Sequence, residues 1–265
     1  MRKIVLFRIS SQGYPKVKVD GVDKYDSLKN LQQTFKDWEW ICVADNCDEQ
    51  LLNNLRAQFS FNQLIETTLG NPGSFWKLYE TALSFIKDED IVYFAEDDYL
   101  HLPGAPSAII EGLQYFNYVT LYDHPDKYKN HTGPVNPYAK SNTYSEPTEV
   151  LEGKMAIWRT SNSTTMTFAV TGKTLKEDKD IWSITRTAKK DFDFDNFCVL
   201  TKQPTILKSR FIKQIPRKIQ FWKKPRRYLG VCVPGLSLHL EQAYLKPSDE
   251  ERFLKKSLAS KDKKN

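Results

Sequence analysis

Three consecutive carboxylates, Glu96, Asp97 and Asp98, follow the apolar run IVYFA in the segment IVYFAEDDYLH. The run predicts a buried strand, and ligands of open α/β sheets bind beyond the carboxyl ends of the strands. Adjacent carboxylates repel one another unless a cation or a group of hydrogen-bond donors neutralises them. Because Mg²⁺ and Mn²⁺ bind oxygen ligands, we expect a divalent cation here that could hold a diphosphate. The alternative is a strand that ends in a solvated acidic turn.

The elements that would position this group alternate between strand and helix patterns. Apolar runs of strand length occur at 3–10, 40–47, 63–69 and 91–98. Helical spacing or helix-start signals mark 27–38, 48–59 and 70–85. This alternation predicts an α/β fold with a mainly parallel sheet and helices on both faces. Further along, 118–121 predicts another strand, and 148–172 predicts a β-rich region of two segments around a polar turn at 161–163.

In this order of elements, residues 3–105 resemble a GT-A (Rossmann-like) glycosyltransferase, in layout close to the large family 2 of inverting enzymes. The resemblance implies that Asp45, at the end of CVADNC, contacts the nucleotide, as do Glu96 and Asp97. It matches Gly70, Asn71 and Gly73 to a glycine-containing turn near the nucleotide. It also implies that Asp98, together with Asp97, binds the metal. We place Arg8, in the first strand, on the nucleotide-sugar side as well.

Two readings of Asp45 remain open. An ionised carboxylate can only accept hydrogen bonds, so Asp45 could bind ribose hydroxyls or a base N–H group. It could instead cap the helix that begins near residue 48.

The resemblance also implies a catalytic base on the acceptor side of the site. The stretch TAKKDFDFDNFCVL is similar to the family's acidic pair at a helix start, and Asp193 is the preferred base, with Asp191 and Asp195 as alternatives. An inverting transfer needs such a carboxylate to take the proton of the acceptor hydroxyl. The alternative is that acidic residues favour a helix N-terminus through capping and the helix dipole.

A basic segment follows, because the chain has no acidic residue from Asn196 to Leu240. With its interleaved apolar residues, this segment could lie on an anionic membrane surface, bind a diphosphate-lipid acceptor or bind nucleic acid. A solvated basic face is the plain alternative, and nucleic acid is disfavoured because it leaves the acidic motif unexplained. Arg226 and Arg227 are expected to hold the departing diphosphate, since arginine binds phosphate oxygens bidentately.

A late histidine completes the expected metal site. The segment GLSLHLE, which presents His239, resembles the element with which GT-A enzymes complete the metal site from the C-terminal side. Neutral imidazole is compatible with Mn²⁺ beside carboxylates.

Composition limits the setting of this site. The 265 residues, 40% of them hydrophobic, predict one globular domain, and no apolar run reaches the roughly 18 residues of a membrane span. Arg8 interrupts the N-terminal apolar stretch, so we expect a first strand and not a signal peptide. Four cysteines without CxxC spacing indicate a reduced, cytoplasmic setting. Within that setting, the protein could attach to the membrane surface through its basic segment.

The sequence thus predicts a glycosyltransferase domain over 1–245, with a nucleotide-sugar half (1–105) and an acceptor half (106–245), and a basic C-terminal appendage that ends in a charged helix and tail (246–265). The expected reaction is a Mn²⁺- or Mg²⁺-dependent, inverting transfer of a sugar from a nucleoside diphosphate of the UDP or GDP type to a glycan or lipid-linked acceptor. The alternatives are a sugar nucleotidyltransferase and a non-catalytic carbohydrate- or nucleic-acid-binding module.

Overall fold

The computed structural model describes residues 1–12, 17–128, 148–187, 192–202, 215–245, 248 and 250–254. Its strands are β1 (Lys3–Ile9), β2 (Glu39–Asp45), β3 (Gln63–Thr67), β4 (Ile91–Glu96), β5 (Tyr99–His101), β6 (Tyr118–Thr120), β7 (Val150–Glu152), β8 (Ile157–Ser161), β9 (Phe168–Thr171), β10 (Leu229–Val233) and β11 (Ser237–His239). Its α-helices are α1 (Lys24–Thr34), α2 (Glu49–Gln58), α3 (Gly70–Leu83), α4 (Ala105–Tyr115), α5 (Gly172–Glu177), α6 (Lys179–Trp182) and α7 (Phe192–Leu200). Short 3₁₀ or π turns span Pro125–Lys127, Ser183–Thr187, Gln242–Tyr244 and Glu250–Leu254.

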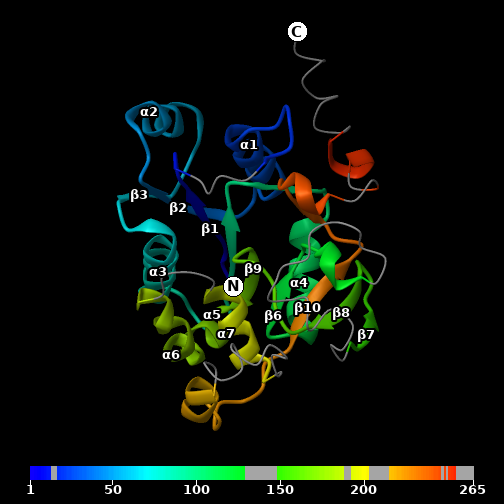
Figure 1. The fold of residues 1–265 in the computed structure, drawn as a ribbon. Coiled ribbons are helices and arrows are strands. Elements are labelled where there is room, and N and C mark those ends of the chain that lie inside the picture. The colour runs from blue at the N-terminus through cyan, green and yellow to red at the C-terminus, as the bar shows by residue number, and fades with distance from the viewer. Residues whose placement is uncertain are drawn as a thin grey trace.

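Among these residues, nine strands form one sheet in the order β3-β2-β1-β4-β9-β6-β10-β8-β7 (Figure 1). The first four are mutually parallel, as the alternating pattern predicted. β9 is antiparallel to both β4 and β6, and β10 is parallel to β6. β4, β6 and β10 therefore point in the same direction, and the whole sheet is mixed. The predicted α/β fold with a central sheet of Rossmann-like kind is confirmed.

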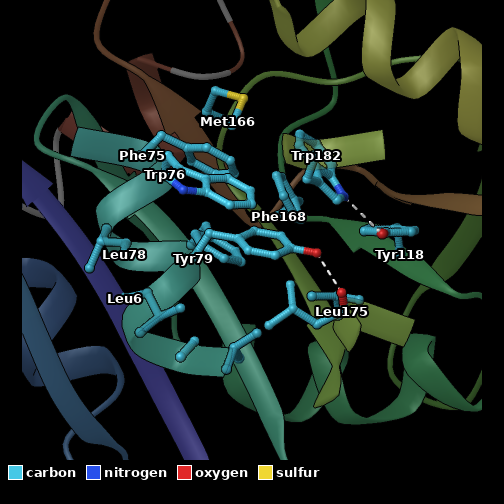
Figure 2. Packing of buried hydrophobic residues seen from close by; sticks show 14 of the residues in the cluster. Leu6, Phe75, Trp76, Leu78, Tyr79, Tyr118, Met166, Phe168, Leu175 and Trp182 are labelled. Carbon is cyan, nitrogen blue, oxygen red and sulfur yellow. Dashed lines mark hydrogen bonds between the residues drawn. The ribbon is translucent and has the colours of Figure 1, made fainter. Parts of the chain in front are cut away.

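The two faces of the sheet carry separate cores, because side chains alternate along each strand. In β1, Ile4 and Leu6 point to the face covered by α3, α5, α6 and α7, whereas Val5 and Phe7 point to the face of α1, α2 and α4. The first core is rich in aromatic rings, which Figure 2 shows packed between α3 and the sheet. Helices thus cover both faces, as the sequence predicted.

Two polar contacts lie inside the aromatic core (Figure 2). Tyr79 of α3 donates its hydroxyl hydrogen to the carbonyl oxygen of Leu175, and Trp182 donates its ring N–H to the hydroxyl of Tyr118 over 3.0 Å. Buried tyrosine and tryptophan side chains need such partners, because an unsatisfied polar group destabilises the folded state. The first contact joins α3 to α5, and the second joins α6 to β6 of the sheet.

The β-rich region predicted for 148–172 is present, but it contains three strands, β7, β8 and β9, where two segments were predicted. β8 and β9 flank the polar turn at 161–163, but they are not neighbours in the sheet. β8 forms a hairpin with β7 and lies beside β10, while β9 is inserted between β4 and β6. Sequence neighbours with a turn between them favour a hairpin, yet here two other strands lie between them. No described helix is long and apolar enough to cross a bilayer.

Candidate active site

The carboxyl ends of the parallel strands β2, β1 and β4 lie side by side and carry polar residues. In the registers of these strands, Arg8 stands beside Glu96, and Asp45 ends the next strand. This is the sheet edge where ligands of open α/β folds bind. The acidic motif of the sequence therefore lies where it was predicted.

The three consecutive carboxylates point in different directions and find different partners. Glu96 points to the α3 face, where its Oε1 accepts a hydrogen bond from Nη2 of Arg8 over 2.6 Å. Asp97 follows β4 and accepts a hydrogen bond from the backbone N–H of Ser10, 3.3 Å away. Asp98 faces β11 and His239. Groups of the protein itself thus offset much of the repulsion between the three carboxylates. That repulsion was the reason for predicting a cation from the sequence.

Asp97 has the weakest compensation of the three. Burial and the neighbouring charge of Asp98 raise the pKa of Asp97 to about 6, against the favourable charge of Lys24 and the Ser10 N–H group. Its contact is with the loop after β1 and not with His239. The structure therefore leaves Asp98 as the carboxylate that faces the histidine.

Asp98 and His239 form the centre of the site. The Nε2 atom of His239 lies 3.0 Å from Oδ2 of Asp98, although 141 positions separate them in the sequence. Lys18 places its ammonium group on the same oxygen. Burial alone would raise the pKa of Asp98, but His239 and Lys18 outweigh it and lower that pKa. The other oxygen, Oδ1, is buried and has no hydrogen-bond partner among the described residues.

The antiparallel pair β5–β11 brings this histidine to the end of β4. His239 is paired with Tyr99 in that register, and the two rings stack with centroids 4.7 Å apart. Tyr122 packs edge-on against the same imidazole at 5.8 Å. The ring orientation of His239 is therefore fixed by packing, as a metal ligand or a proton carrier requires.

Arg8 joins the end of β1 to the start of α3. Its Nη1 donates to the backbone oxygen and to Oδ1 of Asn71, both at 2.7 Å, and it is only 8% exposed. Gly70 adopts the left-handed region with φ +74° at this helix start, a conformation that favours glycine. The structure thus brings together four predicted residues, Arg8, Gly70, Asn71 and Glu96. The guanidinium of Arg8 already binds Asn71 and Glu96.

Asp45 is likewise engaged in contacts with its own chain. Its Oδ1 accepts from the backbone N–H of Leu69 over 2.6 Å and from the hydroxyl of Thr67 over 2.8 Å, and its Oδ2 accepts from Asn46. The capping alternative is wrong, because Asp48 is the residue that caps α2. Asp45 instead positions the turn before α3, which faces the same sheet edge.

The residues present suit a divalent cation only in a limited way. Among the described residues, no group of three or more His, Cys, Asp or Glu side chains is arranged to hold a metal. The pair Asp98 and His239, with a buried carboxylate oxygen that has no partner among those residues, fits a cation that takes its other ligands from phosphates and water. Magnesium is commonly bound in this manner, through one or two protein groups.

Lys18 is a site residue that the sequence did not reveal. The neighbouring Val19 donates its backbone N–H to the oxygen of Leu240, and Lys18 forms an isolated bridge with Glu241. These contacts bring the segment after β1 to Asp98. No motif surrounds Lys18, so only the pairing of two distant segments places it.

Two of the expected catalytic aspartates lie at the start of α7, on the α3 face of the sheet. Asp193 and Asp195 belong to the first turn of α7, and Asp191 lies outside the described residues. α7 packs Phe197 against Tyr118 and Trp182 on the α3 face of the sheet. The charge of Asp195 acts on Arg217 of the basic segment. The helix start was predicted correctly, whereas the base assignment stays a prediction.

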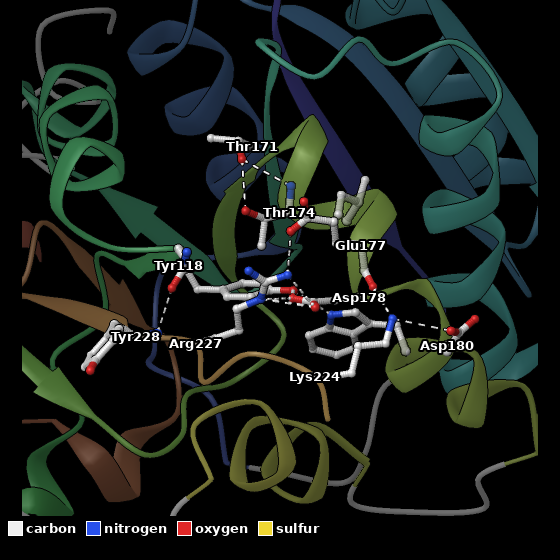
Figure 3. A network of polar contacts seen from close by, with 12 residues as sticks. Tyr118, Thr171, Thr174, Glu177, Asp178, Asp180, Lys224, Arg227 and Tyr228 are labelled. Carbon is white, nitrogen blue, oxygen red and sulfur yellow. Dashed lines mark hydrogen bonds and ion pairs between the residues drawn. The ribbon is translucent and has the colours of Figure 1, made fainter. Parts of the chain in front are cut away.

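The structure does not bring Arg226 and Arg227 to the site. Both precede β10, which runs in the same direction as β4, whereas Asp98 follows β4. The two arginines and Asp98 therefore lie at opposite ends of the strands. Arg227 is 6% exposed and binds Asp178 through Nε and Nη2 over 2.9 to 3.1 Å (Figure 3). Their short separation from His239 in the sequence was misleading, because β10 crosses the sheet between them.

Comparison with known proteins gives likeness of fold alone. No protein-family model matches the sequence, and the curated proteins contain no significant match. Residues 1–349 of S. aureus TarS match with a TM-score of 0.44 at 16% identity, over 74% of this chain and 54% of TarS 1–349, so the chain spans about half of that protein's length.

Two further solved structures differ from TarS in coverage. The 4-diphosphocytidyl-2C-methyl-D-erythritol synthase of Anaerococcus prevotii matches with a TM-score of 0.47 at 12% identity, over 98% of this chain and 99% of its own. The galactosyltransferase LgtC matches with a TM-score of 0.39 at 13% identity, over 74% of this chain and 68% of its own. Their names give different reactions, so the choice between reactions rests on the residues of the site.

Proposed function

We propose that the protein is an inverting glycosyltransferase that moves a sugar from a UDP- or GDP-type donor to a hydroxyl of a glycan or lipid-linked acceptor. The observation that carries the proposal is the pair Asp98 and His239, joined at 3.0 Å at the carboxyl edge of the parallel strands. This edge is the usual ligand-binding position of the fold class. The buried Oδ1 of Asp98, which no described residue contacts by a hydrogen bond, supports a ligand site there.

Asp98 and His239 would hold Mn²⁺ or Mg²⁺, which supplies positive charge to the donor diphosphate when bound. Asp45, Arg8 and Asn71 would act on the donor indirectly, because their contacts shape the turn before α3. The helix that follows offers its N-terminal N–H groups at this edge, and such groups favour anions. The residues of the chain thus bind and orient the donor.

The transfer also needs a base for the acceptor hydroxyl. We keep Asp193 in this role, with Asp191 and Asp195 as alternatives, since the first turn of α7 carries the acidic group. The carboxylate would accept the hydroxyl proton while the oxygen attacks the anomeric carbon and the nucleoside diphosphate departs. An Asp193→Asn variant that keeps full turnover would exclude Asp193.

The proposal is tested by thermal unfolding with UDP or GDP, with and without Mn²⁺. A ligand that binds only the native state stabilises it by about 2.7 kcal/mol at a hundredfold excess over its Kd. We expect Mn²⁺-dependent stabilisation in the wild type and in Asp37→Asn, an exposed carboxylate elsewhere. Asp98→Asn, which retains shape and removes charge, should lose this stabilisation. An unchanged response in Asp98→Asn contradicts the metal assignment.

Product analysis separates the alternatives. A glycosyltransferase releases a nucleoside diphosphate from a nucleotide sugar. A sugar nucleotidyltransferase instead forms the nucleotide sugar from a nucleoside triphosphate and releases pyrophosphate. Metal-dependent nucleotide binding with neither product would indicate a non-catalytic binding module.

A further inference from the structure

A short segment at the far edge of the sheet exposes large apolar side chains. The described part of a helix runs from Ile215 to Gln220, and Ile219 and Trp222 are each 65% exposed. Ile215 and Ile219 follow the spacing i, i+4, which places them on one side of the helix, and Trp222 lies in the turn that follows. Tyr228, six positions beyond Trp222, is 42% exposed as well. We call these four residues the outer face.

The opposite side of this segment is attached to the body of the protein. Phe221 is 7% exposed and belongs to the aromatic core. Arg217 points inward and donates to Oδ1 of Asn196 in α7. Lys202 donates to the backbone oxygen of Trp222 over 2.9 Å. In this segment an arginine therefore points inward, whereas a tryptophan and two isoleucines point to solvent. An ordinary surface helix exposes its charged residues and buries its large apolar ones.

A buried ion-pair network holds the end of the segment in place (Figure 3). Arg227 binds Asp178, which also accepts a hydrogen bond from the hydroxyl of Tyr118 over 2.8 Å. Lys224 donates to the backbone oxygen of Glu177 over 2.6 Å and lies 3.4 Å from the carboxylate of Asp180. With both sides held, the outer face cannot turn inward without breaking these contacts.

Positive charge accompanies the apolar groups. The ammonium of Lys223 lies 5.7 Å from the ring centre of Trp222, and the guanidinium of Arg226 lies 5.0 Å from that of Tyr228. Both basic residues are exposed. The sequence has no acidic residue from Asn196 to Leu240, so the segment itself supplies no negative charge to offset them.

We propose that the outer face, with Lys223 and Arg226, is a docking surface for an anionic lipid bilayer. Tryptophan and tyrosine prefer the boundary between headgroups and hydrocarbon, and neighbouring basic groups bind anionic lipids. Nucleic acid fits less well, because Ile215 and Ile219 offer neither stacking rings nor hydrogen bonds to bases.

This surface and the candidate active site face opposite ways. The segment precedes β10, whereas Asp98 follows β4, and the two strands run in the same direction. In Figure 1 the segment lies at the bottom of the view and α1 and α2 at the top. A protein docked in this manner turns its donor site away from the lipid. The docked enzyme would therefore take acceptors from the aqueous side, which favours a glycan over a lipid-embedded group.

The test is flotation of the protein with phosphatidylcholine vesicles that contain phosphatidylserine, at low salt. Each basic residue near such a surface contributes about 1 kcal/mol, so Lys223→Gln with Arg226→Gln should weaken binding about 30-fold. Ile219→Ser with Trp222→Ser should weaken it at least as much. The fluorescence of Trp222 should shift to shorter wavelength on vesicles.

The matched control removes two exposed positive charges elsewhere, Lys29→Gln with Lys36→Gln, and should leave flotation unchanged. Equal loss in this control, or no flotation of the wild type, overturns the proposal. Binding of single-stranded nucleic acid that depends on Lys223 and Arg226, without vesicle binding, assigns the surface to nucleic acid instead. The assay needs no enzymatic activity, so its failure is distinct from failure of the proposed function.

Discussion

Asp98 Oδ2 contacts both Lys18 and His239, while Oδ1 of the same carboxylate has no hydrogen-bond partner in the part of the chain that the structure describes. An ammonium group on a metal-binding carboxylate competes with a cation for the same charge. If Asp98 holds the proposed cation, Lys18 is expected to leave it when metal and donor bind, and its side chain, 39% exposed, has room to do so.

Replacing Lys18 by methionine tests this competition. Lys18→Met should tighten Mn²⁺ binding without nucleotide by about fivefold, a modest effect because the pair is partly exposed to solvent. Titration calorimetry measures the affinity directly, and Lys29→Met on the exposed side of α1 serves as the control. Unchanged or weaker Mn²⁺ binding in Lys18→Met would show that the lysine does not compete with the metal.

His101 predicts a pH dependence of stability. Its ring is 2% exposed, and burial lowers its pKa to about 3 from 6.5. Above pH 6.5 the imidazole is neutral in the folded and unfolded states alike. As the pH falls from there toward 3, only the unfolded chain binds the proton, so stability is lost at up to about 1.4 kcal/mol per pH unit.

The measurement compares the free energy of unfolding of wild type and His101→Gln between about pH 7 and pH 4. Glutamine does not titrate, so the variant, although less stable at neutral pH, should lose less stability on acidification. Parallel curves for the two proteins would mean that His101 is not the group responsible.

At the scale of elements, the local patterns predicted where helices and strands occur. Asp48 caps α2 through a hydrogen bond to the N–H of Leu51, as a helix-start signal should. Phe35 and Trp38, assigned to a helix by their spacing, are buried but lie beyond Thr34, where α1 ends. Spacing reports which side chains are buried, and tertiary packing decides how far the helix continues.

Gly172 shows how closely one element approaches another. A Cβ atom at this position would lie 1.9 Å from the backbone oxygen of Lys87, and backbone cannot move aside as a flexible side chain can. We expect Gly172→Ala to destabilise the protein by about 1–3 kcal/mol, the usual range for overpacking. Chemical denaturation measures the loss.

The exposed neighbour Lys173→Ala is the control, and it should change stability by less than about 0.5 kcal/mol. If both alanine variants match the wild type, the start of α5 can shift without a free-energy penalty, and the close packing described for it is wrong.

At the scale of the whole molecule, we expect Arg227 to stabilise the fold and not to bind the diphosphate. Arg227→Met leaves the carboxylate of Asp178, 1% exposed, without its cation. Breaking a buried pair from one side destabilises by about 3–5 kcal/mol. The exposed Arg226→Met should change stability little. If Arg227→Met unfolds like the wild type yet loses turnover, the original assignment to the diphosphate is restored.

The long-range arrangement is the part that the sequence could not predict. The pattern at 91–98 located the acidic edge of β4, and GLSLHLE indicated His239, since each carries a local signal. The insertion of β9 between β4 and β6 has no local signal, and neither has the direction of β10. Strand order depends on the packing of distant segments. The sequence-based prediction therefore placed Arg227 at the wrong end of the sheet and did not reveal Lys18.

The position of β10 has a consequence for the growing chain. Among the described strands, β10 lies between β6 and β8, so the β7–β8 hairpin has no link to the sheet until residues 229–233 exist. His239 follows directly. A polypeptide emerging from the ribosome therefore gains the second group of the candidate site only 141 residues after Asp98. A fragment released earlier can contain every acidic residue of the motif and still lack the partner that makes Asp98 a site.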